Sequence, residues 1–197
     1  MRQFLVVAHE APTTPDFALD DLTGAGRMDL LARTVTAAFL LSHGLREAVR
    51  VRLVLGDELT VRFEGDALQG LNPDERSTAA LVRTALGDRD EAIGHQPVET
   101  SPGVFLTKRG LEPALAAAAD EGSIVRLHPD GEAAVDVSPP ADPVFVLSDH
   151  RPLTAAEADS VDAHADLQLS LGPQALHADH AVTVAHNWLD TEGYTRY

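Results

Sequence analysis

The chain has 197 residues, of which 44% are hydrophobic, and its 31 acidic and 15 basic side chains give a formal net charge of −16. This length suits one α/β domain with a substantial core. The absence of cysteine excludes disulfides, zinc–thiolate sites, iron–sulfur clusters and a cysteine nucleophile. Taken as a total, the charge argues against nucleic acid as a partner. The apolar run at 4–8 is too short for a signal peptide or a membrane helix, so we expect a cytoplasmic protein without a membrane partner.

The negative charge is unevenly distributed. Residues 1–60 carry six arginines and eight acids, whereas residues 61–197 carry nine bases and 23 acids. Lys108 is the only lysine, beside fourteen arginines. Such an acidic, lysine-poor surface is expected of a protein from a halophilic organism, because concentrated salt screens self-repulsion beyond roughly 3 Å at 1 M. A GC-rich genome, which favours Arg and Ala, is the alternative explanation.

In the first half of the chain, the pattern predicts a buried strand at 4–8 and then a long loop, 10–27, rich in turn-forming residues. A helix from Met28 to His43 is expected to end at Gly44. Alternating residues at 49–55 and 59–63 predict a hairpin insertion around 49–63. Asn72 and Pro73 are expected to open a helix that ends at Gly87.

The second half alternates strands with helices. Strands are predicted at 103–107, 123–127, 144–147 and 167–171, and helices at 111–121 and 179–190. Thr154 and Glu157 have the spacing of a capping box that opens a further short helix. This alternation predicts a single α/β domain, 1–197, with a mostly parallel sheet flanked by helices.

Two groups of residues suggest chemistry that their spacing does not support. His177, His180 and His186 do not follow the spacing of a zincin motif, and we expect no metal. Ser148, Asp149 and His150 are the residue types of a hydrolase triad, but three consecutive residues cannot form its geometry.

Three strands of the second half end in loops of small and turn-forming residues, at 127–131, 147–150 and 171–173. The carboxyl ends of parallel strands expose backbone N–H and C=O groups, which suits a nucleoside ligand. Ordinary strand-to-helix turns have the same composition, and the pattern alone does not separate the two interpretations.

Together with these loops, four segments carry a resemblance to a known family: APTTPDF at 11–17, LDDL at 19–22, GR at 26–27 and LLSHGLR at 40–46. They resemble the archaeal tRNA pseudouridine(54) N1-methyltransferase family, TrmY, of the SPOUT methyltransferase superfamily. The likeness covers nearly the whole chain, and its N-terminal block is the most specific part. It implies a SPOUT-type α/β fold with a C-terminal trefoil knot, S-adenosyl-L-methionine as cofactor, tRNA as substrate and a homodimer.

The resemblance also assigns a cofactor site to the three strand-end loops, which would contact the methionine, adenine and ribose parts. The residues it implies there are Leu127, Leu147, Ser148, Leu171, Gly172, Pro173 and Leu176. Family members often have glycine at the position of Ser148 and cysteine near Ala181, so whether these two residues touch the cofactor stays open.

The reaction that the resemblance implies needs a proton acceptor and an anion stabiliser. N1 of pseudouridine carries a proton that a carboxylate can accept, and an arginine can stabilise the charge left on the ring carbonyls. We predict Asp21 as the acceptor and Arg27 as the stabiliser, with Asp16 and Asp20 as open alternatives for the acceptor. The other interpretation is that these acids cap turns and the following helix.

The remaining arginines of the first sixty residues suggest an RNA surface. Arg46 and Arg50, together with Arg52, are expected to contact tRNA phosphates, and surface ion pairing is an equally plausible role. Two alternatives for the whole chain stay open: an rRNA pseudouridine N1-methyltransferase, and a non-catalytic nucleotide-binding regulatory protein.

Overall fold

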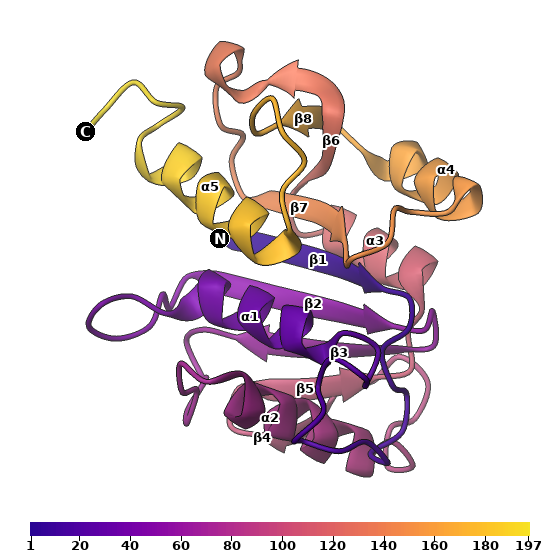
Figure 1. Ribbon diagram of the computed structural model, residues 1–197. Coiled ribbons are helices and arrows are strands. Elements are labelled where there is room, and N and C mark those ends of the chain that lie inside the picture. The colour runs from indigo at the N-terminus through magenta and orange to yellow at the C-terminus, as the bar shows by residue number, and fades with distance from the viewer.

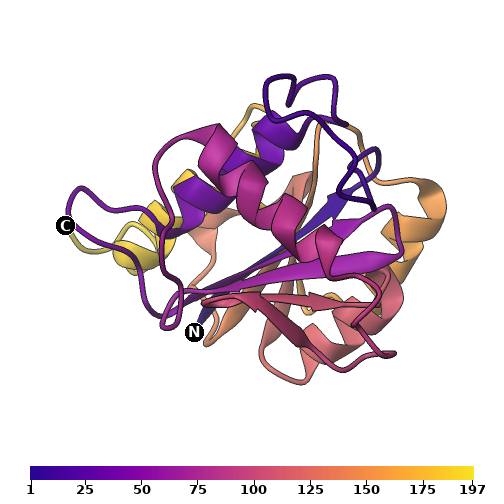
Figure 2. The same cartoon turned by 90° about the horizontal axis from the view of Figure 1, so that it is seen from below.

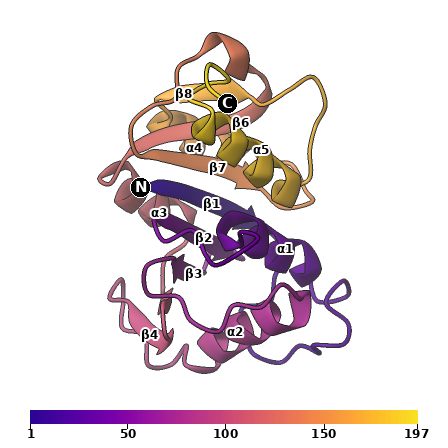
Figure 3. The same ribbon diagram turned by 90° about the vertical axis from the view of Figure 1, so that its left-hand side faces the viewer.

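Eight strands form one sheet in the order β4-β5-β3-β2-β1-β7-β6-β8 in the computed structural model, which describes residues 1–197. The strands are β1 (Arg2–Ala8), β2 (Val49–Leu55), β3 (Leu59–Glu64), β4 (Val98–Ser101), β5 (Val104–Thr107), β6 (Ser123–Ala133), β7 (Pro143–Ser148) and β8 (Leu167–Ser170). The helices are α1 (Met28–Phe39), α2 (Glu75–Gly87), α3 (Leu111–Ala119), α4 (Ala155–His164) and α5 (Ala178–Asp190), with a 3-10 turn at Ala134–Asp136. Figure 3 shows the sheet from β8 at the top to β4 at the bottom.

The sheet has a parallel and an antiparallel half. Strands β2, β1, β7, β6 and β8 pair in parallel, whereas β3, β5 and β4 add to β2 in antiparallel fashion. The predicted α/β fold with flanking helices is confirmed, and the antiparallel half makes the sheet mixed. The β2–β3 hairpin lies within this sheet, because β2 pairs along its whole length with β1. That the hairpin is an insertion into the domain stays a prediction.

Helices cover both faces of the sheet. Helices α1, α2 and α5 lie on the near face in Figure 1, and Figure 2 shows α1 and α2 on one side of the strands with α3 on the other. Strand β1 is buried on both faces: Phe4 and Val6 belong to the core under α1 and α5, while Leu5 and Val7 pack with α3 and α4. This explains its uninterrupted apolar run. None of the helices is long and apolar enough to span a membrane.

Aromatic packing fixes α5 against the centre of the sheet. Phe4 and Phe145 stack with ring centroids 5.4 Å apart, and Trp188 meets Phe145 edge-on at 6.3 Å. The indole N–H of Trp188 donates to the carbonyl of Ala134 at 2.8 Å, which joins α5 to the end of β6. These contacts hold the last turns of α5 against the sheet, and its first residues, Ala178 and Ala181, face the same cavity as the end of β7.

Two predicted boundaries are wrong. Helix α1 ends at Phe39 rather than His43, because Leu40 is extended and pairs with Leu45 across a turn that contains Gly44. Strand β6 does not end at Leu127. It continues to Ala133 through a bulge at 128–131, and both Leu127 and Glu132 are in register with Leu169 of β8.

Other elements differ by a few residues. Strand β4 was not predicted, and it pairs with β5 with an irregularity between Glu99 and Ser101. Helix α2 has Asp74 rather than Asn72 as its N-cap, and the Asp74 carboxylate accepts a hydrogen bond from the N–H of Ser77. The predicted capping box of Thr154 and Glu157 is confirmed at the start of α4.

Candidate functional site

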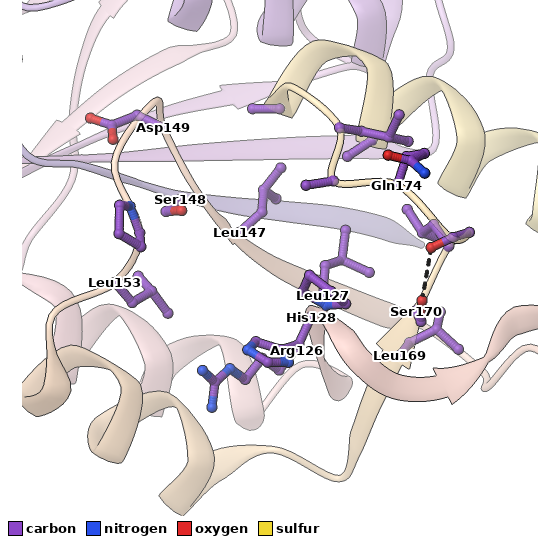
Figure 4. A pocket seen from close by; sticks show the side chains of 18 residues that line it. Arg126, Leu127, His128, Leu147, Ser148, Asp149, Leu153, Leu169, Ser170 and Gln174 are labelled. Atoms are coloured by element: carbon purple, nitrogen blue, oxygen red, sulfur yellow. Dashed lines mark hydrogen bonds between the residues drawn. The ribbon is translucent and has the colours of Figure 1, made fainter.

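A cavity of about 420 Å³ lies where the bulge of β6 and the carboxyl ends of β7 and β8 meet the start of α5 (Figure 4). The carboxyl edge of a parallel sheet is where ligands of α/β proteins bind. The residues that line the cavity are Arg126, Leu127, His128, Pro129, Leu147, Ser148, Asp149, Pro152, Leu153, Leu169, Ser170, Leu171, Gly172, Gln174, Ala175, Leu176, Ala178 and Ala181.

The lining combines apolar walls with a few polar groups. Leucines of β6, β7 and β8 and of the turn after β8 form the walls, and Arg126, His128 and Gln174 add polar side chains. The hydroxyl of Ser170 donates to the carbonyl of Gly172 at 3.1 Å, which fixes the turn after β8 (Figure 4). A cavity of this size and character suits a nucleoside, which has an apolar base and a polar sugar.

The structure brings most of the predicted cofactor residues together. Six of the seven line the cavity: Leu127, Leu147, Ser148, Leu171, Gly172 and Leu176. Pro173 does not line the cavity, although the residues before and after it in the sequence, Gly172 and Gln174, do so. Ala181 also lines the cavity, so no thiol is present at that point of the wall.

A cluster that sequence reasoning missed stands beside the cavity. His9 directly follows β1, Asp149 directly follows β7, and Glu157 lies in the first turn of α4. The ring of His9 has its Nδ1 2.9 Å from Asp149 Oδ1 and its Nε2 3.0 Å from Glu157 Oε2. Burial opposes the charged ring, but the hydrogen bonds to the two carboxylates outweigh it and raise the pKa of His9. A polar residue at the carboxyl end of a central strand was the signal available for His9.

The long loop before α1 folds back against the end of β1. Gly26 has a φ of 58°, and a Cβ there would stand 1.9 Å from the carbonyl oxygen of Glu10, so only glycine fits this crossing. Asp21 is exposed on the loop, and its Oδ1 accepts a hydrogen bond from the N–H of Gly24 at 2.9 Å. Asp21 therefore does cap a turn, while its Oδ2 has no hydrogen-bond partner. Asp16 and Asp20 are exposed on the same loop.

Arg27 occupies the junction between this loop and α1. Its backbone is left-handed, with a φ of 60°, and its guanidinium donates to both carboxylate oxygens of Asp29 at 2.9 and 3.1 Å. The hydrogen bonds to Asp29 are the main cause that raises the pKa of Arg27, and the charge of Asp149 contributes as well. Arg27 is thus within electrostatic reach of the cavity wall. Neither Asp21 nor Arg27 lines the cavity itself.

All three arginines predicted to contact RNA are engaged in ion pairs, and Arg52 is buried with its guanidinium 2.7 Å from Glu121. Arg46 donates to the two carboxylate oxygens of Asp190 at 2.7 and 3.3 Å. Arg50 donates to Glu64 at 2.6 Å and also pairs with Glu121. The alternative interpretation, surface ion pairing, therefore describes what these side chains do in the isolated chain.

The three histidines considered as metal ligands do not converge. His177 and His180 lie 6.2 Å apart, measured between ring centroids, whereas His186 is buried against Phe4. No cluster of His, Asp and Glu in the structure has the geometry to hold a metal ion.

A mixed α/β sheet with a nucleoside-sized cavity at its parallel carboxyl ends defines the chain as a nucleotide- or cofactor-binding α/β protein. Residues 1–194 match the family model described as putative SAM-dependent RNA methyltransferase. The chain belongs to this family, which confirms the family predicted from its motifs.

Curated relatives match over the full length. The chain is 63% identical over 198 residues to the tRNA (pseudouridine(54)-N(1))-methyltransferase of Haloarcula marismortui and 61% identical to that of Haloferax volcanii, with all of each chain covered. It is 40% identical to the protein of the same name from Methanococcoides burtonii, with 96% of both chains covered. Among solved structures, Archaeoglobus fulgidus Nep1 bound to S-adenosylhomocysteine has a TM-score of 0.65 at 8% identity, covering 94% of this chain and 95% of that one. This likeness shows that the two chains share a fold, in agreement with the predicted α/β fold class.

Proposed function

We propose that the chain is an S-adenosyl-L-methionine-dependent methyltransferase that methylates N1 of pseudouridine 54 in tRNA. The observation that carries the proposal is its 63% identity, over the whole of both chains, to an enzyme named for that reaction. The family description supports the cofactor, and the cavity supplies a place for it. The same membership supports a C-terminal trefoil knot, a homodimer and a cytoplasmic location as parts of the proposal.

The residues of the cavity fit S-adenosyl-L-methionine. Leu127, Leu147 and Leu171 offer apolar surface to the adenine, and the backbone beside Ser148 and Gly172 offers polar groups to the ribose and methionine parts. Pro173 would shape the same turn from behind. When bound, this cofactor supplies a methyl group that is already electrophilic on its sulfonium, so no metal is required. Positioning by the protein then supplies much of the remaining rate.

In this proposal the loop before α1 provides the acid–base chemistry. The free Oδ2 of Asp21 accepts the N1 proton, and Arg27 stabilises the negative charge that develops on the ring carbonyls. The charge of Asp149, which lines the cavity, is among the causes that raise the pKa of Arg27. The pair with Asp29 holds the guanidinium in place.

RNA binding in the proposal draws on the arginines of the first sixty residues. Arg46 and Arg50 contact tRNA phosphates by exchanging a carboxylate partner for a phosphate, which Arg binds in the same bidentate way. The carboxylates that they leave, Asp190 and Glu64, weaken this exchange. Shape and hydrogen bonding therefore contribute a large share of recognition.

Methyl transfer to two tRNA transcripts tests the proposal. One transcript carries pseudouridine at position 54 and the other carries uridine, with labelled S-adenosyl-L-methionine as donor. We expect incorporation only in the first, because only pseudouridine has a protonated N1. Equal incorporation in both would contradict the N1 mechanism. Calorimetry separates the alternatives: cofactor binding without transfer favours a regulatory protein, and transfer to an rRNA fragment alone favours the rRNA enzyme.

The role of Asp21 is tested by Asp21→Asn, which keeps the size and the contact with Gly24 but removes the base. We expect turnover to fall by about 10²-fold or more, with the cofactor dissociation constant unchanged. Asp66→Asn, at an exposed site in a different loop, is the matched control. If Asp21→Asn keeps full turnover while Asp16→Asn or Asp20→Asn loses it, the role moves to that residue.

A further inference from the structure

The loop after β7 forms one wall of the cavity. Ser148, Asp149, Pro152 and Leu153 all line it, and Figure 4 shows the carboxylate of Asp149 directed away from the cavity. This side chain is 1% exposed and therefore acts on the loop rather than on a ligand. The contacts of the Asp149 side chain therefore set the position of this wall.

Both carboxylate oxygens and the backbone N–H of Asp149 form hydrogen bonds within the protein. Its Oδ2 accepts the backbone N–H of His9 at 2.8 Å, and its Oδ1 accepts both the ring of His9 at 2.9 Å and the N–H of Arg151 at 2.8 Å. Its own N–H donates to the carbonyl of Val7 at 2.9 Å. The loop is thus fastened to the end of β1 by three hydrogen bonds, two of them charge-assisted.

The second ring nitrogen of His9 reaches a second carboxylate. Its Nε2 lies 3.0 Å from Glu157 Oε2, and the same oxygen accepts from the N–H and hydroxyl of Thr154. An ionised carboxylate only accepts hydrogen bonds, so a ring between two of them must donate from both nitrogens and is an imidazolium. The side chain of His9 is 13% exposed, which limits the screening of these contacts by water.

We propose that His9, held as an imidazolium between Asp149 and Glu157, is the positioning residue that fixes loop 148–153 as a wall of the cofactor site. The inference rests on the proposed function for the identity of the ligand. It assigns to β1 and α4 a part in cofactor binding, although neither contributes a lining residue. Its consequence is that the wall loosens when the ring loses a proton.

The surroundings of His9 favour the charged ring. The other charged or titratable groups that face the cluster are Glu10, Arg27, His150 and Arg151. Glu10 pairs with Arg151 and with His150, so these groups largely neutralise one another. Asp149 and Glu157 remain as the partners of His9, and their hydrogen bonds raise the pKa of His9 above 6.5 against the opposing effect of burial. The contacts of His9 with both carboxylates are therefore complete below that pKa and are lost as the pH rises through it.

The test compares cofactor binding by the full chain and by His9→Gln between pH 6 and pH 9. For the wild type we expect the dissociation constant of S-adenosyl-L-methionine to rise with pH, with a midpoint above 6.5. For His9→Gln we expect a dissociation constant that is about tenfold higher than that of the wild type at pH 6 and does not change with pH. In steady-state kinetics the KM for the cofactor should rise while kcat at saturation stays the same, since the ring does not touch the reacting atoms.

Two further variants complete the design. Glu157→Gln keeps the contact with Asp149 and should lower the pH midpoint, which also covers the case that His9→Gln does not fold. His164→Gln is the matched control, because His164 faces Glu112 at 3.5 Å, away from the cavity, and should behave as the wild type.

Amide hydrogen exchange of the ligand-free chain gives a readout that does not depend on the cofactor. At one fixed pH, amides of 148–153, those of Asp149 and Arg151 in particular, should exchange faster in His9→Gln. A wild type that fails to bind S-adenosyl-L-methionine would overturn the proposed cofactor, while the exchange rates would still decide the role of His9. Unchanged exchange, or a His9→Gln affinity and pH profile equal to those of the wild type, would overturn the inference.

Discussion

His186 is buried in α5 with both ring nitrogens paired. Its Nε2 lies 3.0 Å from the carbonyl oxygen of Ala38, and its Nδ1 lies 3.3 Å from Nη1 of Arg2. The carbonyl only accepts and the arginine only donates, so the ring is neutral with its proton on Nε2. Burial, together with the positive charges of Arg46 and Arg2, lowers the pKa of His186 to about 4.

This shift predicts a loss of stability in mild acid. The unfolded histidine titrates near 6.5, so between that pH and about 4 the unfolded chain binds the proton and the folded chain does not. The free energy of unfolding should therefore fall by about 3 kcal/mol across this window. Urea unfolding at half-unit steps of pH measures the fall. His9 does not obscure it, because its ring is charged in both states below 6.5.

His186→Gln provides the comparison, since its amide can still donate to the carbonyl of Ala38 but does not titrate. We expect the fall in the free energy of unfolding between pH 6.5 and pH 4.5 to become smaller in this variant and to stay as in the wild type in His164→Gln. An equal slope in His186→Gln would assign the acid sensitivity to the carboxylates instead.

Residues of the site differ in how far the sequence predicts them. Leu147 and Leu171 could be predicted, because an apolar run followed by turn-forming residues marks the end of a strand, and parallel strands end at one edge. Leu127 lines the cavity as predicted, although β6 continues beyond it. The cluster of His9, Asp149 and Glu157 could not be predicted, since His9 and Asp149 are 140 positions apart and no local pattern records their contact. The roles of Asp21 and Arg27 rest on resemblance, because the loop that carries them has no periodicity.

At the scale of elements, β6 shows why a local rule fails. Pro129 and Gly131 are typical of a turn, and they predict that the strand ends at Leu127. The strand instead passes β8 twice, with the bulge between the two contacts with Leu169. A long-range pairing therefore overrides the local preference. The same holds for α1, where the pairing of Leu40 with Leu45 ends the helix early.

Gly131 permits this crossing of β6 over β8. A Cβ at Gly131 would stand 2.6 Å from the backbone N of Leu169 and 2.7 Å from the carbonyl oxygen of Gln168, and backbone atoms of a paired strand cannot yield. We expect Gly131→Ala to lower the free energy of unfolding by roughly 1–3 kcal/mol. It should also weaken cofactor binding, because Leu127, just before the bulge, and its β8 partner Leu169 both line the cavity.

Thermal unfolding and calorimetry with S-adenosyl-L-methionine measure the two effects of Gly131→Ala. Gly87→Ala is the control, because a Cβ at Gly87 meets no atom within 4 Å, so this variant should lower neither the stability nor the affinity for the cofactor. If Gly131→Ala is as stable as the wild type, β6 and β8 can move apart at Gly131 without a loss of stability, and the prediction is wrong.

At the scale of the whole molecule, the ion pairs change the meaning of the charge distribution. The arginines of the first sixty residues do not form a free positive surface. Arg33 donates to Asp29, Glu75 and Asp179 and so ties α1 to α2 and α5, and Arg52 is buried against Glu121. Positive charge is therefore used to hold elements together, and most of the net charge of −16 is left on exposed carboxylates.

This arrangement predicts that salt stabilises the chain. Raising KCl from 0.1 to 1 M shortens the screening length from about 10 Å to about 3 Å, which relieves repulsion among the exposed carboxylates. The pairs of Arg50 and Arg52 are screened less because they are partly buried, and exposed pairs contribute little at either concentration. We expect the melting temperature to rise by about 5 °C, which corresponds to roughly 2 kcal/mol for a chain of this size. Near the isoelectric point of about 4.7 the net charge vanishes, and the gain should shrink with it. A melting temperature that falls in KCl at pH 7.5 would mean that the ion pairs, rather than the repulsion, dominate the electrostatics of the fold.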